Sequence, residues 1–242
     1  MSRPDFLRKL RKYVAALPAL AFGFMASPAF STVVTINASS VTPGSSSASF
    51  LGANLTSVGG SFTTTTTTGI NPSTAIGISG GSVGDEVDVS GEKITLSFGS
   101  TLAVVNEITL GMLFLKGVSG NQINEAAQLQ TSGGVACANG STTCILSAVG
   151  VWRGSIFGVQ TLSPATEGNG GIFRIANPFG SELISSLDIL AWKFTPAGAA
   201  NSDFGLVSVT YTTTTVIPEP GTLVLVGLGM LGLASGGKRA RG

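Results

Sequence analysis

The chain has no histidine and few charged side chains, and these shortages exclude several kinds of chemistry. Charged residues make up 10% of its 242 residues, against about 25% in ordinary soluble proteins. Without histidine there can be no Ser-His-Asp triad. With only two cysteines as well, the chain lacks the side chains that usually provide the ligands of a zinc site. The composition therefore argues against triad hydrolases and zinc proteins.

Basic residues are also scarce in the middle of the chain, because eight of the thirteen lie near its two ends. Between Thr32 and Ile217, five basic residues stand against ten acidic ones, which gives this segment a net charge of −5. Proteins that bind nucleic acids need clustered positive charge to contact phosphates. We therefore expect no nucleic-acid partner.

The beginning of the chain has the three-part layout of a secretory signal peptide. Residues 1–12 are basic, residues 13–26 are mostly apolar, and small residues follow. Ala29 and Ser31 stand at positions −3 and −1 of a plausible cut before Thr32. The alternative is a retained membrane anchor, but two prolines in and after the apolar segment argue against an uninterrupted helix.

The end of the chain combines a Pro-Glu-Pro turn, an uncharged apolar run and a basic cluster. Pro218 and Pro220 flank Glu219 and end any preceding strand, since proline cannot donate to a β-ladder. Residues 221–237 carry no charge and would rise about 25 Å as a helix, the short end of what spans a bilayer core. The positive-inside rule keeps the basic cluster in the cytoplasm. This cluster consists of Lys238, Arg239 and Arg241.

In this order, the three features resemble the PEP-CTERM sorting signal of Gram-negative bacteria. In that family an integral membrane enzyme, exosortase, recognises the signal, cuts near the motif and passes the protein to the cell surface or the extracellular polysaccharide matrix. The resemblance implies a transient stay in the inner membrane, exosortase as a partner, and a link to exopolysaccharide or biofilm. The alternative is a tail anchor that is never cut, although a simple anchor needs no Pro-Glu-Pro.

The body between the two ends has the pattern of short β-strands. Ile94, Leu96 and Phe98 alternate with Thr95 and Ser97, which places one set on each face of a sheet. Segments rich in Gly, Asn, Ser and Pro separate the expected strands. These strands are residues 33–36, 94–98, 104–115, 145–149, 155–162, 173–175, 187–194 and 207–212. The pattern predicts an all-β protein, a β-sandwich of the jelly-roll kind.

The predicted organisation is therefore a signal peptide (1–31), a β-sandwich ectodomain (32–215) and a sorting signal (216–242). Two stretches of the body, GGSVGDEVDVSGEKITLSFGSTLAVVNEITLG and NSDFGLVSVTY, resemble segments of other PEP-CTERM ectodomains. This resemblance implies a jelly roll of the kind often used for sugar binding, although a fold alone does not establish binding.

We predict the local structure of three further segments separately. Residues 122–130 are the one modest helical candidate. Thr63–Thr68 and Thr212–Thr215 are runs of β-branched residues, which favour an extended backbone. We expect the first run to form an edge strand and the second to lead into a stalk. The alternative for both runs is O-glycosylation.

Cys137 and Cys144 lie in the turn-like stretch CANGSTTC. Two cysteines in an exported chain are expected to form a disulfide. The closed loop is short, so the bond should stabilise the fold by about 2 kcal/mol. The alternative is a pair of free thiols.

Asp85, Glu86 and Asp88 form the densest acidic cluster of the chain, in GGSVGDEVDVSGE. Carboxylates on a Gly-rich loop suit Ca²⁺, which prefers several oxygen ligands. The spacing does not match an EF-hand loop. Two interpretations stay open, a calcium-binding loop and a solvated turn between strands.

No residue pattern marks a catalytic site. A glycosidase needs only two carboxylates, but nothing sets a pair such as Glu167 and Asp188 apart. Trp152 and Trp192 could stack on sugar rings, yet buried tryptophans in a sandwich core are commoner. We expect a non-enzymatic surface protein with a structural or adhesive role. The alternatives are a carbohydrate-binding module, with or without calcium, and thirdly a polysaccharide hydrolase.

Overall fold

The computed structural model describes the strands of the body and most of their connections. The described residues are 29–67, 72–81, 84–89, 91–117, 123–132, 144–148, 152–153, 159–166, 168–192 and 202–216. Within these ranges no helix has the length and apolar character needed to cross a membrane. The predicted signal peptide up to residue 28 and the predicted membrane helix at residues 221–237 lie outside them.

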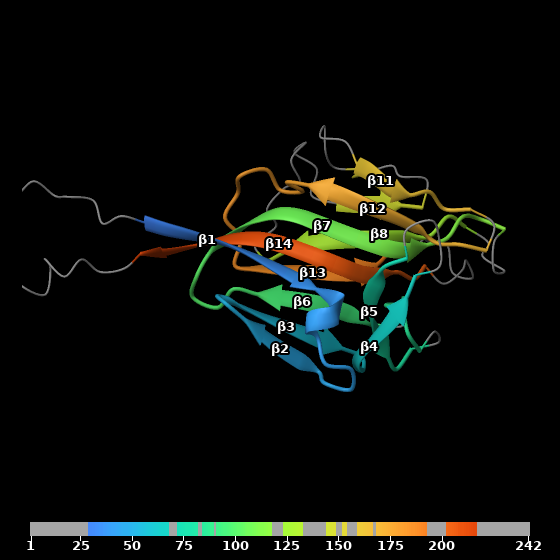
Figure 1. Ribbon diagram of the computed structural model, residues 1–242, viewed down its shortest axis with the longest axis horizontal. Helices are drawn as coiled ribbons and strands as arrows, with labels where there is room; N and C mark the ends of the chain where they lie inside the picture. Colours follow the sequence, from blue (N-terminus) through green and yellow to red (C-terminus); the bar gives the residue numbers. More distant parts are fainter. Residues whose placement is uncertain are drawn as a thin grey trace, which may run out of the picture. The chain divides into compact units, whose positions relative to one another are not determined.

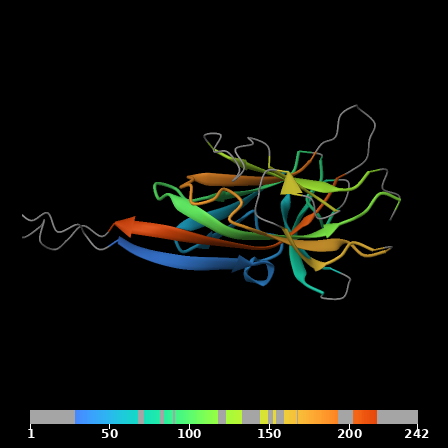
Figure 2. The ribbon, with the colours of Figure 1, turned by 90° about the horizontal axis from the view of Figure 1, so that it is seen from above.

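The described part of the body is all-β and consists of two antiparallel sheets (Figure 1). In the first sheet the strand order is β11-β12-β7-β14-β5-β4, and β1 also pairs with β14. Figure 2 shows β1, in blue, running alongside β14, in red. The strands of this sheet are β1 (Ala29–Asn37), β4 (Ser61–Thr66), β5 (Thr74–Ser79), β7 (Ala103–Leu113), β11 (Val159–Ser163), β12 (Gly171–Ala176) and β14 (Gly205–Val216).

The second sheet has the order β10-β9-β8-β13-β6-β3-β2. Its centre is formed by strands far apart in the sequence, since β13 lies between β6 and β8. A short 3-10 helix, η1 (Ala38–Ser40), follows β1. The strands of this sheet are β2 (Ser47–Phe50), β3 (Ala53–Val58), β6 (Lys93–Ser97), β8 (Ala126–Thr131), β9 (Cys144–Ser147), β10 (Trp152–Arg153) and β13 (Ser186–Ala191).

One hydrophobic core is shared by residues of both sheets. The alternation predicted for β6 is confirmed, because Ile94 and Leu96 are fully buried while Thr95 and Ser97 are partly exposed. Each side chain of a strand points to the face opposite its neighbours, so a single period-two pattern supplies both the core and the solvent-facing surface.

β14 departs from the simple alternation predicted for Val207, Val209 and Tyr211. Its pairing with β7 shifts between Leu206 and Ser208, so Val207 is the extra residue of a β-bulge. Leu206, Val209 and Tyr211 are fully buried, whereas Val207 is only partly buried. A bulge changes the face of the sheet to which the following residues point, so Leu206, rather than Val207, shares the buried face with Val209 and Tyr211. The alternation of the sequence alone could not reveal this change.

One further expectation for local structure is wrong. Residues 123–130 do not form a helix, because they contain β8, which pairs with β13 and β9. Thr212–Thr215 belongs to β14, which continues to Val216, and the stalk expected after this run lies outside the described residues. The first threonine run was expected to form an edge strand. Its residues 63–66 lie in β4, which is the last strand in the order of its sheet.

Residues Phe30–Thr215 form one compact unit. β1 begins at Ala29, which lies before the predicted cut at Thr32. Cleavage at that point would therefore leave β1 to begin at Thr32.

Candidate functional site

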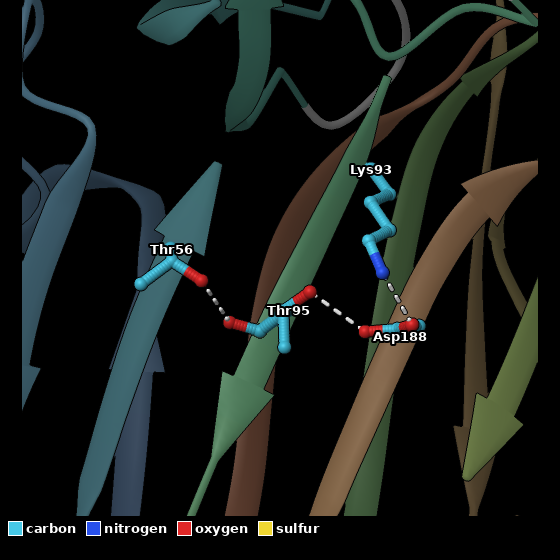
Figure 3. Close-up of polar contacts among 4 residues, drawn as sticks. All are labelled: Thr56, Lys93, Thr95 and Asp188. Carbon is cyan, nitrogen blue, oxygen red and sulfur yellow. Dashed lines mark hydrogen bonds and ion pairs between the residues drawn. The ribbon is translucent and has the colours of Figure 1, made fainter. Parts of the chain in front are cut away.

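The solvent-facing side of the second sheet carries a polar ladder across three strands (Figure 3). Asp188 of β13 lies between two side chains of β6. The Lys93 ammonium lies 2.7 Å from Asp188 Oδ2, and the Thr95 hydroxyl donates to Asp188 Oδ1 at 2.6 Å. Thr56 of β3 donates a longer bond of 3.5 Å to the Thr95 carbonyl oxygen. The register places these residues side by side, since Asp188 is paired with Thr95, and Thr95 with Thr56.

An open hollow lies beside this ladder, where the β2–β3 turn meets the end of β6. Asn54 is exposed there, and its side-chain oxygen accepts a hydrogen bond of 3.1 Å from the Ser49 hydroxyl. The hollow is lined by Gly52, Ala53, Asn54, Ser97, Phe98, Gly99 and Ser100. The ladder and the hollow together offer amide, hydroxyl, ammonium and carboxylate groups on one polar surface.

Aromatic rings contribute little to this surface in the described residues. Phe98 lines the hollow but is only 3% exposed, and the exposed large hydrophobic side chains are all aliphatic. Trp192 follows β13 and is partly buried, with its backbone N–H bonded to the Ala126 carbonyl oxygen at 2.8 Å. The side chain of Trp152 lies outside the described residues. A sugar on this surface would be held by hydrogen bonds rather than by stacking on a ring.

The three residues of the predicted acidic loop have different surroundings. Asp85 is exposed, whereas Glu86 and Asp88 are 6% and 1% exposed. The Asp88 N–H donates to Glu92 Oε2 at 3.0 Å, and burial raises the pKa of Glu92. Residues 86–88 of this loop are therefore interior, whereas Gly84 and Asp85 are exposed to solvent. In the described ranges no group of three or more Asp, Glu, Cys or His side chains is arranged to hold a metal ion, and calcium binding stays a prediction.

Glu86 belongs instead to a cluster of buried carboxyl groups from three separate segments. It lies in the connection from β5 to β6, Glu125 immediately precedes β8, and Asp203 lies two residues before β14. Glu125 and Asp203 are 1% and 6% exposed. Val87 and Phe204 exchange backbone hydrogen bonds of 2.8 and 3.2 Å in an antiparallel bridge, which places Asp203 opposite Asp88 and diagonal to Glu86. We call Glu86, Glu125 and Asp203 the carboxyl cluster.

Glu125 is held by the backbone on two sides. The Phe114 N–H donates to Glu125 Oε2 at 2.6 Å, and the Glu125 N–H returns a bond of 3.0 Å to the Phe114 carbonyl oxygen. The Ala148 N–H donates to the Glu125 carbonyl oxygen at 2.8 Å. These contacts fix the Glu125 carboxyl where β7 and β9 end and β8 begins.

Burial and mutual repulsion raise the pKa of both glutamates of the cluster. For Glu86 the largest cause is burial, followed by the charge of Asp203, the hydrogen bond with Asp203 and the charge of Asp85. For Glu125 the pKa is raised by burial, then by the hydrogen bond with Asp203 and its charge, against a lowering by the Phe114 N–H. Low dielectric and like charges both disfavour the ionised form. Each glutamate is therefore biased towards the form that carries a proton.

Sequence reasoning missed Glu125 and Asp203. Both are isolated acidic residues at the start of a strand, in INEAAQLQ and NSDFGL. The available signal was an acidic residue placed directly against a run of apolar strand residues, which is uncommon because buried charge is costly. The signal did not show that the two residues meet each other and Glu86.

The other predicted residues are distributed over the sandwich. Cys144 opens β9, is 1% exposed and is disulfide-bonded. Cys137 lies outside the described residues, so the pairing of the two stays a prediction. Glu167 also lies outside them, and Asp188 is engaged by Lys93 and Thr95, as described above. The residues of the predicted sorting signal from 217 onwards are not described either.

Residues 216–239 match the model of the PEP-CTERM protein-sorting motif. The chain carries a PEP-CTERM sorting signal. The match includes Pro218, Glu219, Pro220, Lys238 and Arg239, and it begins at Val216, the last residue of β14. No curated protein and no solved structure matches the chain. The PEP-CTERM motif implies export and exosortase-dependent sorting to the cell surface.

Proposed function

We propose that this PEP-CTERM protein is a structural or adhesive component of the cell surface or of the extracellular polysaccharide matrix. The observation that carries the proposal is the sorting motif at residues 216–239. A removable C-terminal signal acts as an address and leaves the exported body free of the membrane. The predicted signal peptide at residues 1–31 and transient anchoring by residues 221–237 belong to the same proposal.

The all-β body supports a structural role. Its two sheets share one core, and few charged residues occur between Thr32 and Ile217. A jelly-roll arrangement of these sheets is part of the proposal. Such a rigid module can present a broad polar surface to a hydrated matrix, and rigid sheets hold hydrogen-bonding groups in fixed positions better than loops do.

Carbohydrate binding is the second candidate, and the polar surface of the second sheet favours it. Asn54 and Ser97 line the open hollow, and Asp188 lies further along the same sheet. Amide, hydroxyl and carboxylate groups are suitable partners for sugar hydroxyls. Calcium at Asp85, Glu86 and Asp88 would be an auxiliary to this role. A polysaccharide hydrolase is the third candidate, and no described residue favours it.

Mass spectrometry of mature material from the native host tests the sorting step. We expect the carboxyl end to lie near Pro218–Pro220, with the apolar run and the basic cluster removed. A Glu219→Ala variant should accumulate at full length in the membrane fraction. Full-length chains on mature wild-type material would contradict the proposal.

The role of the body requires a separate experiment. Deleting the gene should weaken the cohesion of the surface matrix, and the wild-type chain should restore it. A glycan array on the exported protein distinguishes the first two candidates: binding that an Asn54→Ala variant loses would favour carbohydrate recognition. A flat array with a cohesion defect would favour the structural role, and release of reducing sugars from matrix polysaccharide would favour a hydrolase.

A further inference from the structure

The first and last strands of the described body pair with each other. β1 and β14 are neighbours in the first sheet, and Figure 2 shows them side by side as far as the start of β1 and the end of β14. In Figure 1 β1, in blue, begins where β14, in red, ends, so the two strands run in opposite directions. The Thr35 and Thr210 hydroxyl oxygens lie 3.0 Å apart across this pair. The start of the body is therefore held against its end.

The last residues of β14 have β1 as their one described neighbour. On one side, the pairing with β7 stops at Thr213, which lies opposite Ala103, the first residue of β7. On the other side, β5 pairs with β14 at Leu206, far from this end. β14 nevertheless continues to Val216. Among the described strands, only β1 is placed to supply the partner of residues 214–216.

The register of the pair follows from counting along two antiparallel strands. Thr35 lies beside Thr210, and the same count places residues 29–31 opposite residues 214–216. The bounds of the strands agree with this count, since β1 begins at residue 29 and β14 ends at residue 216. The predicted cut before Thr32 would therefore remove the partner of residues 214–216.

We propose that the N-terminal cut prepares the substrate of the C-terminal cut: residues 29–31 hold residues 214–216 in the sheet, and their removal releases that segment to exosortase. This inference rests on the proposed sorting function. The first step is hydrolysis of the Ser31–Thr32 peptide bond, in which one water molecule yields the Ser31 carboxylate and the Thr32 amine. The second step breaks a peptide bond near Pro218–Pro220 and passes the acyl group to water or to a hydroxyl or amine of the cell surface.

The paired segment and the sorting signal overlap, because Val216 belongs both to β14 and to the matched motif. A segment must leave the body before it can enter an active site, so the rate of cutting follows the fraction of molecules in which the segment has opened. One backbone hydrogen bond of ordinary strength lowers that fraction about fivefold. Retained residues 29–31 should therefore slow the C-terminal cut by at least about fivefold.

Two variants that both keep the N-terminal segment attached test the proposal in the native host. Ser31→Tyr replaces the small residue that the N-terminal cut requires. It also keeps the strand, since Ser31 is exposed and tyrosine favours β-structure. Phe30→Pro/Ser31→Pro blocks the same cut but breaks the pairing. Because successive N–H groups of a strand point to alternate sides, one of the two prolines removes a donor to β14.

Pulse labelling followed by mass spectrometry measures the order and the rate of both cuts. In the wild type, no chain should appear that has lost only its C-terminal end. Whether its N-terminal cut fails or moves upstream, Ser31→Tyr should lose its C-terminal end at least about fivefold more slowly than the wild type. Phe30→Pro/Ser31→Pro should approach the wild-type rate.

Three results are decisive against this order of events. A wild-type rate in Ser31→Tyr would overturn it, and so would equal slowing of both variants, which would assign the effect to the retained N-terminal segment and not to strand pairing. Wild-type chains that lose the C-terminal end first would also overturn it. A wild type that never loses this end would instead refute the sorting function itself.

Amide hydrogen exchange reports the pairing without depending on either cut. Both variants are prepared with Glu219→Ala, which keeps the chain at full length, and are extracted from the membrane fraction. Residues 214–216 should exchange more slowly in Ser31→Tyr than in Phe30→Pro/Ser31→Pro, because the prolines remove donors of the β1–β14 ladder. Equal exchange of this segment in the two variants would contradict the proposed pairing.

Discussion

The Tyr211 hydroxyl donates a hydrogen bond of 2.8 Å to the carbonyl oxygen of Leu51. Tyr211 lies in β14 of the first sheet, and Leu51 lies in the β2–β3 turn of the second, so the bond joins the two sheets. The Tyr211 ring also packs edge-on against Phe98, with the ring centroids 5.1 Å apart. Burial raises the pKa of Tyr211 to about 12, so the hydroxyl keeps its proton and remains a donor throughout the neutral range.

Tyr211→Phe should lower the free energy of unfolding by about 1 kcal/mol, because it removes one hydrogen bond and keeps the ring. Tyr211→Ala should cost about 3–5 kcal/mol, since it also leaves a cavity between the sheets. Urea denaturation of the two variants measures both values. Equal losses in the two variants would show that the ring contributes nothing beyond its hydroxyl, contrary to its full burial.

The ion pair between Lys93 and Asp188 should contribute little to stability. The two side chains are 36% and 26% exposed, and water screens such pairs, so we expect a coupling of less than about 1 kcal/mol. A double-mutant cycle with Lys93→Met and Asp188→Asn measures the coupling, which should shrink further at high salt. A larger coupling that does not respond to salt would mean that the polar ladder is shielded from solvent.

Gly77 of β5 should tolerate no side chain. A Cβ atom there would lie 1.9 Å from the Asp85 carbonyl oxygen, and this backbone adjoins Glu86. Gly77→Ala should therefore destabilise the protein by at least about 1–3 kcal/mol, the usual cost of overpacking. Gly84→Ala is the matched control, because a Cβ atom at Gly84 would meet nothing within 4 Å. Chemical denaturation should show a large loss only for Gly77→Ala, and equal effects would contradict the close approach.

The predicted disulfide should be detectable in the exported protein. A peptide digest without reductant should contain Cys137 and Cys144 in one linked pair, and reductant should separate them. The variant with Ser at both positions should lose about 2 kcal/mol of unfolding free energy, because the closed loop is short. Two alkylatable thiols in the unreduced protein would refute the pairing.

The alternation of residue types predicted several strands well but could not locate their irregularities. Ile94, Leu96 and Phe98 are buried as expected, since their facing depends only on the period of the strand. The helix expected at residues 122–130 is wrong because local propensity is weak: Leu129 pairs with Ile189 of β13 and with Cys144 of β9. Long-range pairing of this kind overrides local preference.

The sequence by itself determined where the protein is sent and that it is all-β. The sorting signal is a linear address, read in chain order by its processing enzyme, and the strand period is a local property of each segment. The tertiary structure decided what lies together. Glu86, Glu125 and Asp203 are distant in the chain, and only the Val87–Phe204 pairing and the order of the strands bring their segments together. The raised pKa values of Glu86 and Glu125 depend on burial and on nearby like charges, which arise only after the sheets have packed.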